Sequence, residues 1–172
     1  MTIPGIHKDL LYAKQRVYDI CGFNCTHIKA EEESADYGAC TFRLNGNLIA
    51  FRAAKFTPTK TGQFVTVWKR SKEGPIRPFD SSDPIDFVVI STRNKERNGQ
   101  FIFSRMVLCD KGIMTHNGKE GKRGMRVYPP WDQASSKQAA NTQNWQADYF
   151  IEMTDDKRID IDRAKKLLGA LN

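Results

Sequence analysis

Two aspartates and one lysine have the residue types that a metal-dependent nuclease requires. Asp83 and Asp86 stand directly before the apolar run 87–90, and Lys55 follows the strand-like run 48–51. In such a site two carboxylates hold Mg²⁺, and the cation and a lysine together stabilise the charge on the phosphate. If the strand ends converge, the three groups form a nuclease centre. Alternatively, the aspartates only form a turn and cap a strand.

Lysine and arginine are concentrated in the middle of the chain. The sequence carries a formal charge of +7, whereas residues 43–126 hold 17 basic and 7 acidic residues, a net +10, and the flanks sum to −3. Such a segment predicts a positive face, because lysine and arginine neutralise phosphates and release their counterions. The alternative is a solvated face without a partner. The candidate phosphate contacts are Arg52, Lys55, Lys60, Lys69, Arg70, Lys72, Lys119, Lys122, Arg123 and Arg126.

The segment 112–132 is rich in glycine as well as in basic residues. Gly118, Gly121 and Gly124 alternate with the cations. Glycine lets backbone N–H groups approach an anion closely. We therefore expect a flexible basic loop at this point, with a solvated surface turn as the alternative.

Three aromatic residues lie beside basic residues and could stack on nucleic-acid bases: Trp68, Tyr128 and Trp131. Single-strand binders use such stacking. Aromatic residues of this kind are more often part of a core, and Pro129 and Pro130 beside Trp131 favour a rigid packed corner. His116 stands alone in a loop and is interpreted as solvated.

Helical periodicity is present near both ends of the chain. Apolar residues predict a helix over 9–21, with Asp9 as its N-cap and Gly22 as its end. A polar helix is expected over 138–150 and an amphipathic one over 161–171. Three aromatic residues of the second helix are expected in the core: Trp145, Tyr149 and Phe150.

Strand-like patterns occupy the middle of the chain. Residues 41–44 and 48–51 flank Asn45-Gly46, a pair that favours a two-residue hairpin turn. Alternation over 63–69 and 100–108, and the apolar run 85–90, predict further strands. We expect an α+β fold with a mixed or antiparallel sheet of about five strands, flanked by helices.

Length and composition indicate one domain over residues 1–172. No run approaches the roughly 20 apolar residues of a membrane span, and the N-terminus lacks the apolar region of a secretory signal, so we expect a soluble cytoplasmic protein. The four cysteines could form disulfides or a zinc site. Their spacing supports neither, and free thiols are the preferred interpretation: Cys21, Cys25, Cys40 and Cys109.

Several unusual blocks in one order resemble the MepB family, which is bacterial and named from a multidrug-efflux operon. They are FRAAKFTPTKTGQFVTVWKR (51–70), PIRPFDSSDPIDFVVI (75–90), GQFIFSRMVLCDKGI (99–113), GKRGMRVYPPWD (121–132) and TQNWQADYF (142–150). The resemblance implies a fold similar to type II restriction endonucleases and nucleic-acid binding with no or weak catalysis. Ala53 stands where those enzymes carry an acid two residues before the lysine, and Lys55 precedes Asp83 instead of following it.

The leading hypothesis is a nucleic-acid-binding protein whose basic face contacts the phosphate backbone, with double-stranded DNA as the expected partner. No cofactor is expected, and Mg²⁺ only if the protein is a nuclease, which is the first alternative. The second is a protein- or small-anion-interaction module of an efflux or stress operon. No coiled coil or exposed apolar helix marks a subunit interface, so the sequence assigns no oligomeric state.

Overall fold

The computed structural model describes residues 3–70 and 74–169. Its largest element is a six-stranded sheet in the order β1 (Cys25–Ala30), β2 (Cys40–Leu44), β3 (Asn47–Ala53), β8 (Phe87–Asn94), β9 (Arg97–Ser104) and β11 (Phe150–Glu152). Neighbouring strands are antiparallel except β3 and β8, which run parallel. The predicted α+β fold with a mixed sheet is confirmed, and the main sheet has six strands instead of about five.

Side chains of the central strands alternate between two hydrophobic cores. In β3, Ile49 and Phe51 belong to one core and Ala50 belongs to the other. The residues of β8 and β9 alternate in the same way. Successive side chains of a strand point to opposite faces, so a strand that is apolar on both faces must be covered twice. The sheet therefore lies between two covering layers.

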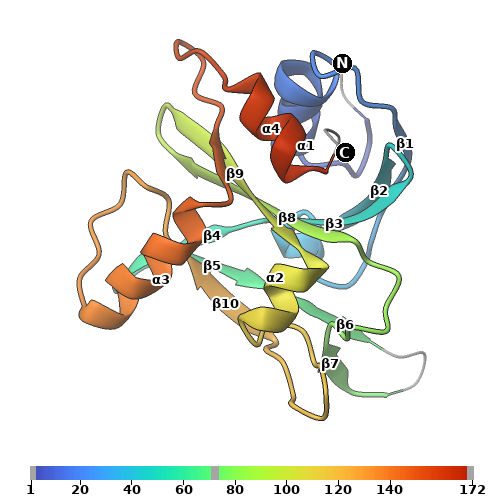
Figure 1. Ribbon diagram of the computed structural model, residues 1–172, viewed down its shortest axis with the longest axis vertical. Helices are drawn as coiled ribbons and strands as arrows, with labels where there is room; N and C mark the ends of the chain where they lie inside the picture. The colour runs from blue at the N-terminus through green and yellow to red at the C-terminus, as the bar shows by residue number, and fades with distance from the viewer. Residues whose placement is uncertain (1–2, 71–73, 170–172) are drawn as a thin grey trace.

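One layer consists of helices from both ends of the chain: α1 (Lys8–Ala13), its π-helical continuation η1 (Lys14–Tyr18) and α4 (Ile161–Leu167) (Figure 1). His7, not the predicted Asp9, caps α1, because its Nδ1 accepts the N–H of Asp9 at 3.1 Å. Asp9 is buried and its carboxylate accepts hydrogen bonds from the Arg93 guanidinium at 2.8 and 3.1 Å. The aspartate thus anchors the helix to β8 instead of starting it.

The other layer contains a three-stranded sheet in the order β10 (Gly124–Val127), β5 (Lys60–Thr66) and β4 (Lys55–Thr57), together with α2 (Arg105–Asp110) and α3 (Lys137–Ala147) (Figure 1). A two-stranded sheet of β6 (Trp68–Arg70) and β7 (Ile76–Pro78) and a short 3-10 helix, η2 (Ala35–Tyr37), complete the elements. The expected flexible loop over 112–132 therefore contains a paired strand, β10.

The predicted hairpin is confirmed. β2 and β3 pair antiparallel, with Leu44 opposite Asn47. Asn45 and Gly46 both have positive φ, 50° and 84°, as the primed two-residue turn requires. The turn residues therefore set the register of this strand pair.

Other boundaries differ from the prediction. The alternating run 63–69 is divided between β5 and β6. The strand expected over parts of 100–108 is β9, which ends at Ser104, and Oγ of Ser104 accepts the N–H of Val107 at 3.4 Å and so caps α2. The helix expected to reach residue 150 ends at Ala147, and Phe150 begins β11. Leu171 of the predicted C-terminal helix lies outside the described residues.

Among the described residues, no helix is both long and apolar enough to cross a membrane. All four cysteines are free thiols. Cys40 is fully buried, and this burial raises the pKa of its thiol to about 12, while the other three are half-buried. The likeness to type II restriction endonucleases stays a prediction.

A buried chain of polar groups joins η1 to the main sheet. The Tyr18 hydroxyl donates to Oε1 of Gln100 at 2.7 Å, and Nε2 of Gln100 donates to Oγ of Ser91 at 2.9 Å. Tyr18 and Gln100 are each 0% exposed. An unpaired polar group in a buried site costs free energy, so this hydrogen-bonded chain favours one position of η1 on the sheet.

A second buried glutamine attaches α3 to the three-stranded sheet. Oε1 of Gln146 accepts the N–H of Tyr128 at 2.8 Å, and its Nε2 donates to the carbonyl of Arg126 at 3.0 Å. The Gln146 side chain is fully buried. It therefore satisfies two backbone groups at the end of β10 that would otherwise lack partners.

Tyr18→Phe should lower the free energy of unfolding by about 1–3 kcal/mol, because the Gln100 acceptor is left unpaired in a buried site. Urea denaturation monitored by circular dichroism measures the change. Tyr37→Phe is the matched control, because the half-buried Tyr37 hydroxyl has no hydrogen-bond partner among the described residues. Equal effects of the two substitutions would contradict the role given to the buried chain.

Gln146→Leu should lower the free energy of unfolding by about 2–6 kcal/mol, since each of two buried backbone groups left unpaired costs about 1–3 kcal/mol. Gln138→Leu, at an exposed position of the same helix, should change it by less than about 0.5 kcal/mol. The same denaturation experiment compares them. A Gln146→Leu protein as stable as the Gln138→Leu protein would show that Gln146 does not hold α3 in place.

Candidate functional site

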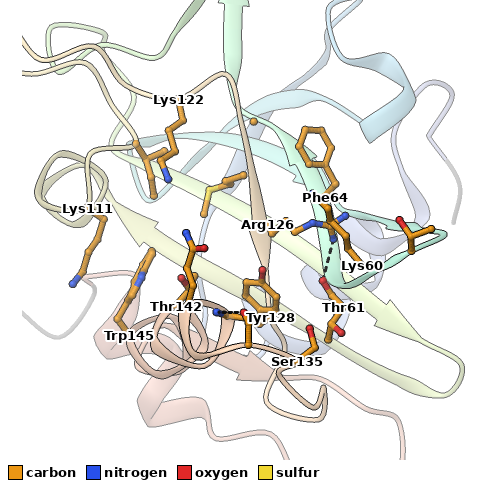
Figure 2. A pocket seen from close by; sticks show the side chains of 17 residues that line it. Lys60, Thr61, Phe64, Lys111, Lys122, Arg126, Tyr128, Ser135, Thr142 and Trp145 are labelled. Atoms are coloured by element: carbon orange, nitrogen blue, oxygen red, sulfur yellow. Dashed lines mark hydrogen bonds between the residues drawn. The ribbon is translucent and has the colours of Figure 1, made fainter.

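A groove of about 670 Å³ opens between the three-stranded sheet and α3 (Figure 2). Its lining comes from β5, β10, α3 and the segments that follow α2 and precede β10. Among the described residues that line it there is no aspartate or glutamate, whereas four lining residues are basic: Lys60, Lys111, Lys122 and Arg126. The groove is therefore a concave surface with a positive potential.

The helix α3 forms one wall of the groove. Ser136 caps it, since its Oγ accepts the N–H of Ala139 at 3.0 Å. Gln138, Thr142 and Trp145 follow at intervals of four and three residues, a spacing that places them on one helical face. This face supplies an amide, a hydroxyl and an indole ring to the groove.

The opposite wall comes from β5 and β10. Arg126 of β10 pairs with Phe64 of β5, so both side chains point to the same face of the small sheet. The Arg126 guanidinium donates to the carbonyl of Thr61 at 3.1 Å and to Oγ1 of Thr57. Both acceptors are neutral. Arg126 is thus held in position by neutral acceptors, and no carboxylate in these contacts neutralises its positive charge.

The glycines of the basic segment serve packing at two positions. A Cβ atom on Gly124 would lie 2.4 Å from Cζ of Phe64, and one on Gly121 would lie 2.2 Å from the carbonyl oxygen of Ile113. The N–H of Gly121 already donates to Oγ1 of Thr115 at 2.9 Å. The N–H of Gly121, which was expected to approach an anion, is therefore used in a hydrogen bond within the fold. Gly124 makes room for the Phe64 ring.

Two groove residues were not predicted as binding residues from the sequence. Lys111 follows α2, and its Nζ lies 5.2 Å from the centre of the Trp145 ring. Trp145 also packs against Phe103 and Tyr149, at ring separations of 5.4 and 6.4 Å, which agrees with its predicted place at the core. Both residues lie inside the blocks that carry the family resemblance, and that is the signal that points to them.

Three predicted phosphate contacts lie outside this groove and are paired with carboxylates: Lys69 with Asp83 at 2.5 Å, Arg70 with Glu33 at 2.7 Å and Arg123 with Glu120 at 2.8 Å. Hydrogen bonds from Arg70 and Trp68 hold the pKa of Glu33 below its usual value. The opposite charges of each pair cancel much of the electrostatic field that either charge alone would exert at a distance. These cations are therefore weaker attractors of phosphate than those of the groove.

Arg52 is a correction to the sequence prediction. It is 1% exposed, and its guanidinium donates to the carbonyl of Phe51 at 2.8 Å and lies 5.5 Å from the centre of the Phe79 ring. Burial lowers the pKa of Arg52. Because it does not reach the surface, Arg52 cannot contact a phosphate there and is a structural residue.

Two further predicted cations, Lys55 and Lys119, do not line the groove. Lys55 is exposed, and its Nζ sits 4.8 Å from the centre of the Tyr37 ring. Lys119 is exposed in the loop before β10 and makes backbone hydrogen bonds with His116. Lys72 lies outside the described residues. Of the predicted phosphate contacts, Lys60, Lys122 and Arg126 are the ones that the fold brings together.

The three predicted catalytic residues are not brought together. Asp86 lies where β3 and β8 begin, and its Oδ2 accepts the N–H of Leu48 at 2.9 Å. Lys55 lies beyond the other end of β3, roughly 20 Å along the strand. Asp83 binds Lys69 and accepts the N–H of Asp80 at 2.8 Å. Within the described residues, no three His, Cys, Asp or Glu side chains are grouped to hold a metal ion.

Of the three candidate stacking residues, Tyr128 lines the groove. The Trp68 indole N–H donates to Glu33 at 3.4 Å, and Trp131 packs against Phe150 with a ring separation of 5.5 Å. His116, interpreted from the sequence as solvated, is exposed and is hydrogen-bonded to Ser81. The packed corner expected around Trp131 is therefore present, and of the three candidates Tyr128 is the one that shares the groove with its four cations.

Comparisons with known proteins give one consistent result. No curated protein matches the sequence. The MepB-like family matches residues 31–152, more than half of the chain. The crystal structure of MepB is similar with a TM-score of 0.74 and 32% sequence identity, and the match covers 89% of this chain and 100% of that chain. On the extent of the family match and on this identity, the chain belongs to the MepB-like family.

Proposed function

We propose that this protein binds nucleic acid and that the groove between β5, β10 and α3 holds its phosphate groups. The observation that carries the proposal is the set of four groove cations without a carboxylate among the described lining residues. Phosphate is the anion that several convergent lysines and arginines suit, since guanidinium forks and ammonium groups both pair with it. The family resemblance implies the same class of partner.

The groove cations differ from the cations around β6 in having no carboxylate partner among the described residues. Lys69, Arg70 and Arg123 each lie within 3 Å of a carboxylate oxygen. No ion pair among the described residues involves Lys60, Lys111, Lys122 or Arg126. A concave wall with low-dielectric protein behind it concentrates the field of such charges. The groove therefore offers a polyanion more net attraction than the equally basic surface around β6.

Binding of this kind is sequence-independent and needs no catalytic group. Phosphate contacts fix the position of a nucleic acid and supply most of its non-specific affinity. The proposal assigns no role to Asp83 and Asp86 beyond the turn and strand caps described above. It requires only that the cations stay charged and exposed. Lys60, Lys111 and Lys122 are exposed, and Arg126 is half-buried.

Lys60→Ala/Lys122→Ala should weaken binding to fluorescently labelled DNA at least tenfold at low salt. The slope of log affinity against log salt should become shallower by roughly 1.4–1.8, because each lost phosphate contact contributes about 0.7 for single strands and 0.9 for duplexes. Fluorescence anisotropy over a salt series measures both quantities.

The matched control is Arg158→Ala/Lys166→Ala, which removes two exposed charges near α4 on the other face of the main sheet. This variant should keep the slope of the unmodified protein and lose less than about threefold in affinity, through net charge alone. Equal loss in the two variants would mean that binding does not occur in the groove. Absence of DNA binding by the unmodified protein at low salt would refute the proposed function.

A phosphate-bearing small molecule is the second candidate, favoured by the size of the groove. Its volume of about 670 Å³ falls within the range of about 300–1,000 Å³ that ligand sites occupy. Calorimetric titration with inorganic pyrophosphate and with a nucleoside monophosphate separates the two functions. Tight binding of either, with no affinity for DNA, would favour the small-molecule site.

A further inference from the structure

We propose that the groove takes the unpaired nucleotides of a single strand, with bases packed on its aromatic side chains and phosphates on its cations. This inference rests on the proposed nucleic-acid function and names the form of the nucleic acid. It departs from the double-stranded DNA that the leading sequence hypothesis named as the expected partner. Three observations carry it: the size of the groove, its aromatic lining and the position of the cations around that lining.

Size is the first observation. A groove of about 670 Å³ is as large as a ligand site, whereas the major groove of a duplex is itself about 12 Å wide and 8.5 Å deep. A duplex therefore cannot enter and would touch only the rim. The cations on the inner walls would then face few of its phosphates. A volume of this size accommodates a short stretch of a single strand.

The aromatic lining is the second observation. Phe64, Tyr128 and Trp145 all line the groove. In a duplex each base face is covered by its neighbours, so aromatic side chains of a groove reach only bases that are unpaired. A surface that bound only the backbone of a duplex would gain nothing from three such rings.

Each ring is supported from behind, which makes it a rigid surface for a base. Trp145 packs against Phe103, and Phe64 lies against Gly124 and near the edge of Tyr37 at a ring separation of 6.2 Å. A Cβ atom on Gly62 would lie 2.7 Å from two ring atoms of Tyr128, so that ring lies against the backbone of the β4–β5 hairpin. Rigid rings lose little conformational entropy when a base packs on them.

The third observation is the arrangement of charges around the rings. Figure 2 shows cations on both sides of the groove, with the Tyr128 ring between them: Lys111 and Lys122 on the side of Trp145, and Lys60 and Arg126 on the side of Phe64. A strand that runs between the walls can place phosphates toward either side and turn its bases toward the rings. Binders of single strands combine a basic groove and aromatic surfaces in this manner.

Lys111 covers part of the Trp145 surface that a base would use. Its Nζ lies 5.2 Å from the ring centre, and its side chain is exposed. An exposed cation–π contact is worth about two- to fivefold in affinity, whereas one stacked base is worth about five- to 150-fold. The base therefore displaces the ammonium group, which is then available to a phosphate of the same strand.

The test compares three labelled nucleic acids on the unmodified protein: a short single strand, the duplex of the same sequence, and an abasic strand of the same length and charge. We expect the single strand to bind at least tenfold more tightly than the duplex, and the abasic strand to lose at least fivefold. Anisotropy at fixed salt measures all three affinities, and no substitution that might disturb folding is involved.

A variant locates the effect in the groove. Tyr128→Leu should bring the affinity ratio of the base-bearing strand to the abasic strand closer to 1, because a leucine offers a base no aromatic face. Circular dichroism and thermal melting check that the variant folds. Gln15→Leu, at an exposed position of η1 on the other face of the main sheet, should keep the ratio of the unmodified protein.

The outcomes separate this inference from the proposed function. Duplex binding as tight as single-strand binding, or an abasic strand that binds as well as the normal one, would overturn the inference and leave phosphate binding in place. Salt-sensitive binding with an unchanged ratio in Tyr128→Leu would also overturn it. Failure of all three nucleic acids to bind would remove both the inference and the proposed function.

Discussion

The burial of the main sheet on both faces is the constraint on which the rest of the structure depends. Because β3, β8 and β9 are apolar on both sides, two layers must cover them, and the chain uses its terminal helices for one and a smaller sheet with α2 and α3 for the other. Gln146 then joins α3 to β10 through backbone groups. The groove lies between the three-stranded sheet and α3, the two parts of the second layer that Gln146 joins.

The positions of carboxylates, more than the number of cations, decide where this protein offers a positive surface. Glu33 and Arg70 are 37 residues apart in the chain and meet at 2.7 Å, and Asp83 meets Lys69 in the same way. Exposed pairs of this kind add little stability, but they reduce the net charge of the surface around β6. The groove lacks such partners among its described lining residues, which makes it the candidate site.

Several residues with chemically active side chains are used for structure. Arg52 is buried against the Phe79 ring. The carboxylates of Asp83 and Asp86 accept hydrogen bonds from backbone N–H groups. Asp9 joins α1 to β8 through Arg93. Arg52 and Asp9 are buried and need partners to offset their lost hydration, and all four side chains already make hydrogen bonds within the fold. Residue type suggested a nuclease centre as one alternative, although Ala53 and the order of Lys55 and Asp83 did not fit its pattern, and the structure places Lys55 and Asp86 at different ends of β3.

The sequence by itself determined the Asn45-Gly46 hairpin and the α+β class, because both follow from local residue patterns. It also determined the family and the concentration of charge in the middle of the chain. It also named Lys60, Lys122 and Arg126 among the candidate phosphate contacts. Only the tertiary structure decided that these three meet Lys111 and Trp145 in one groove, that Arg52 is buried and that Lys55 lies far from Asp86. The physical reason is that strand order and parallel register, such as Ile49 opposite Phe87, bring distant segments together, and local propensity does not encode which segments pair.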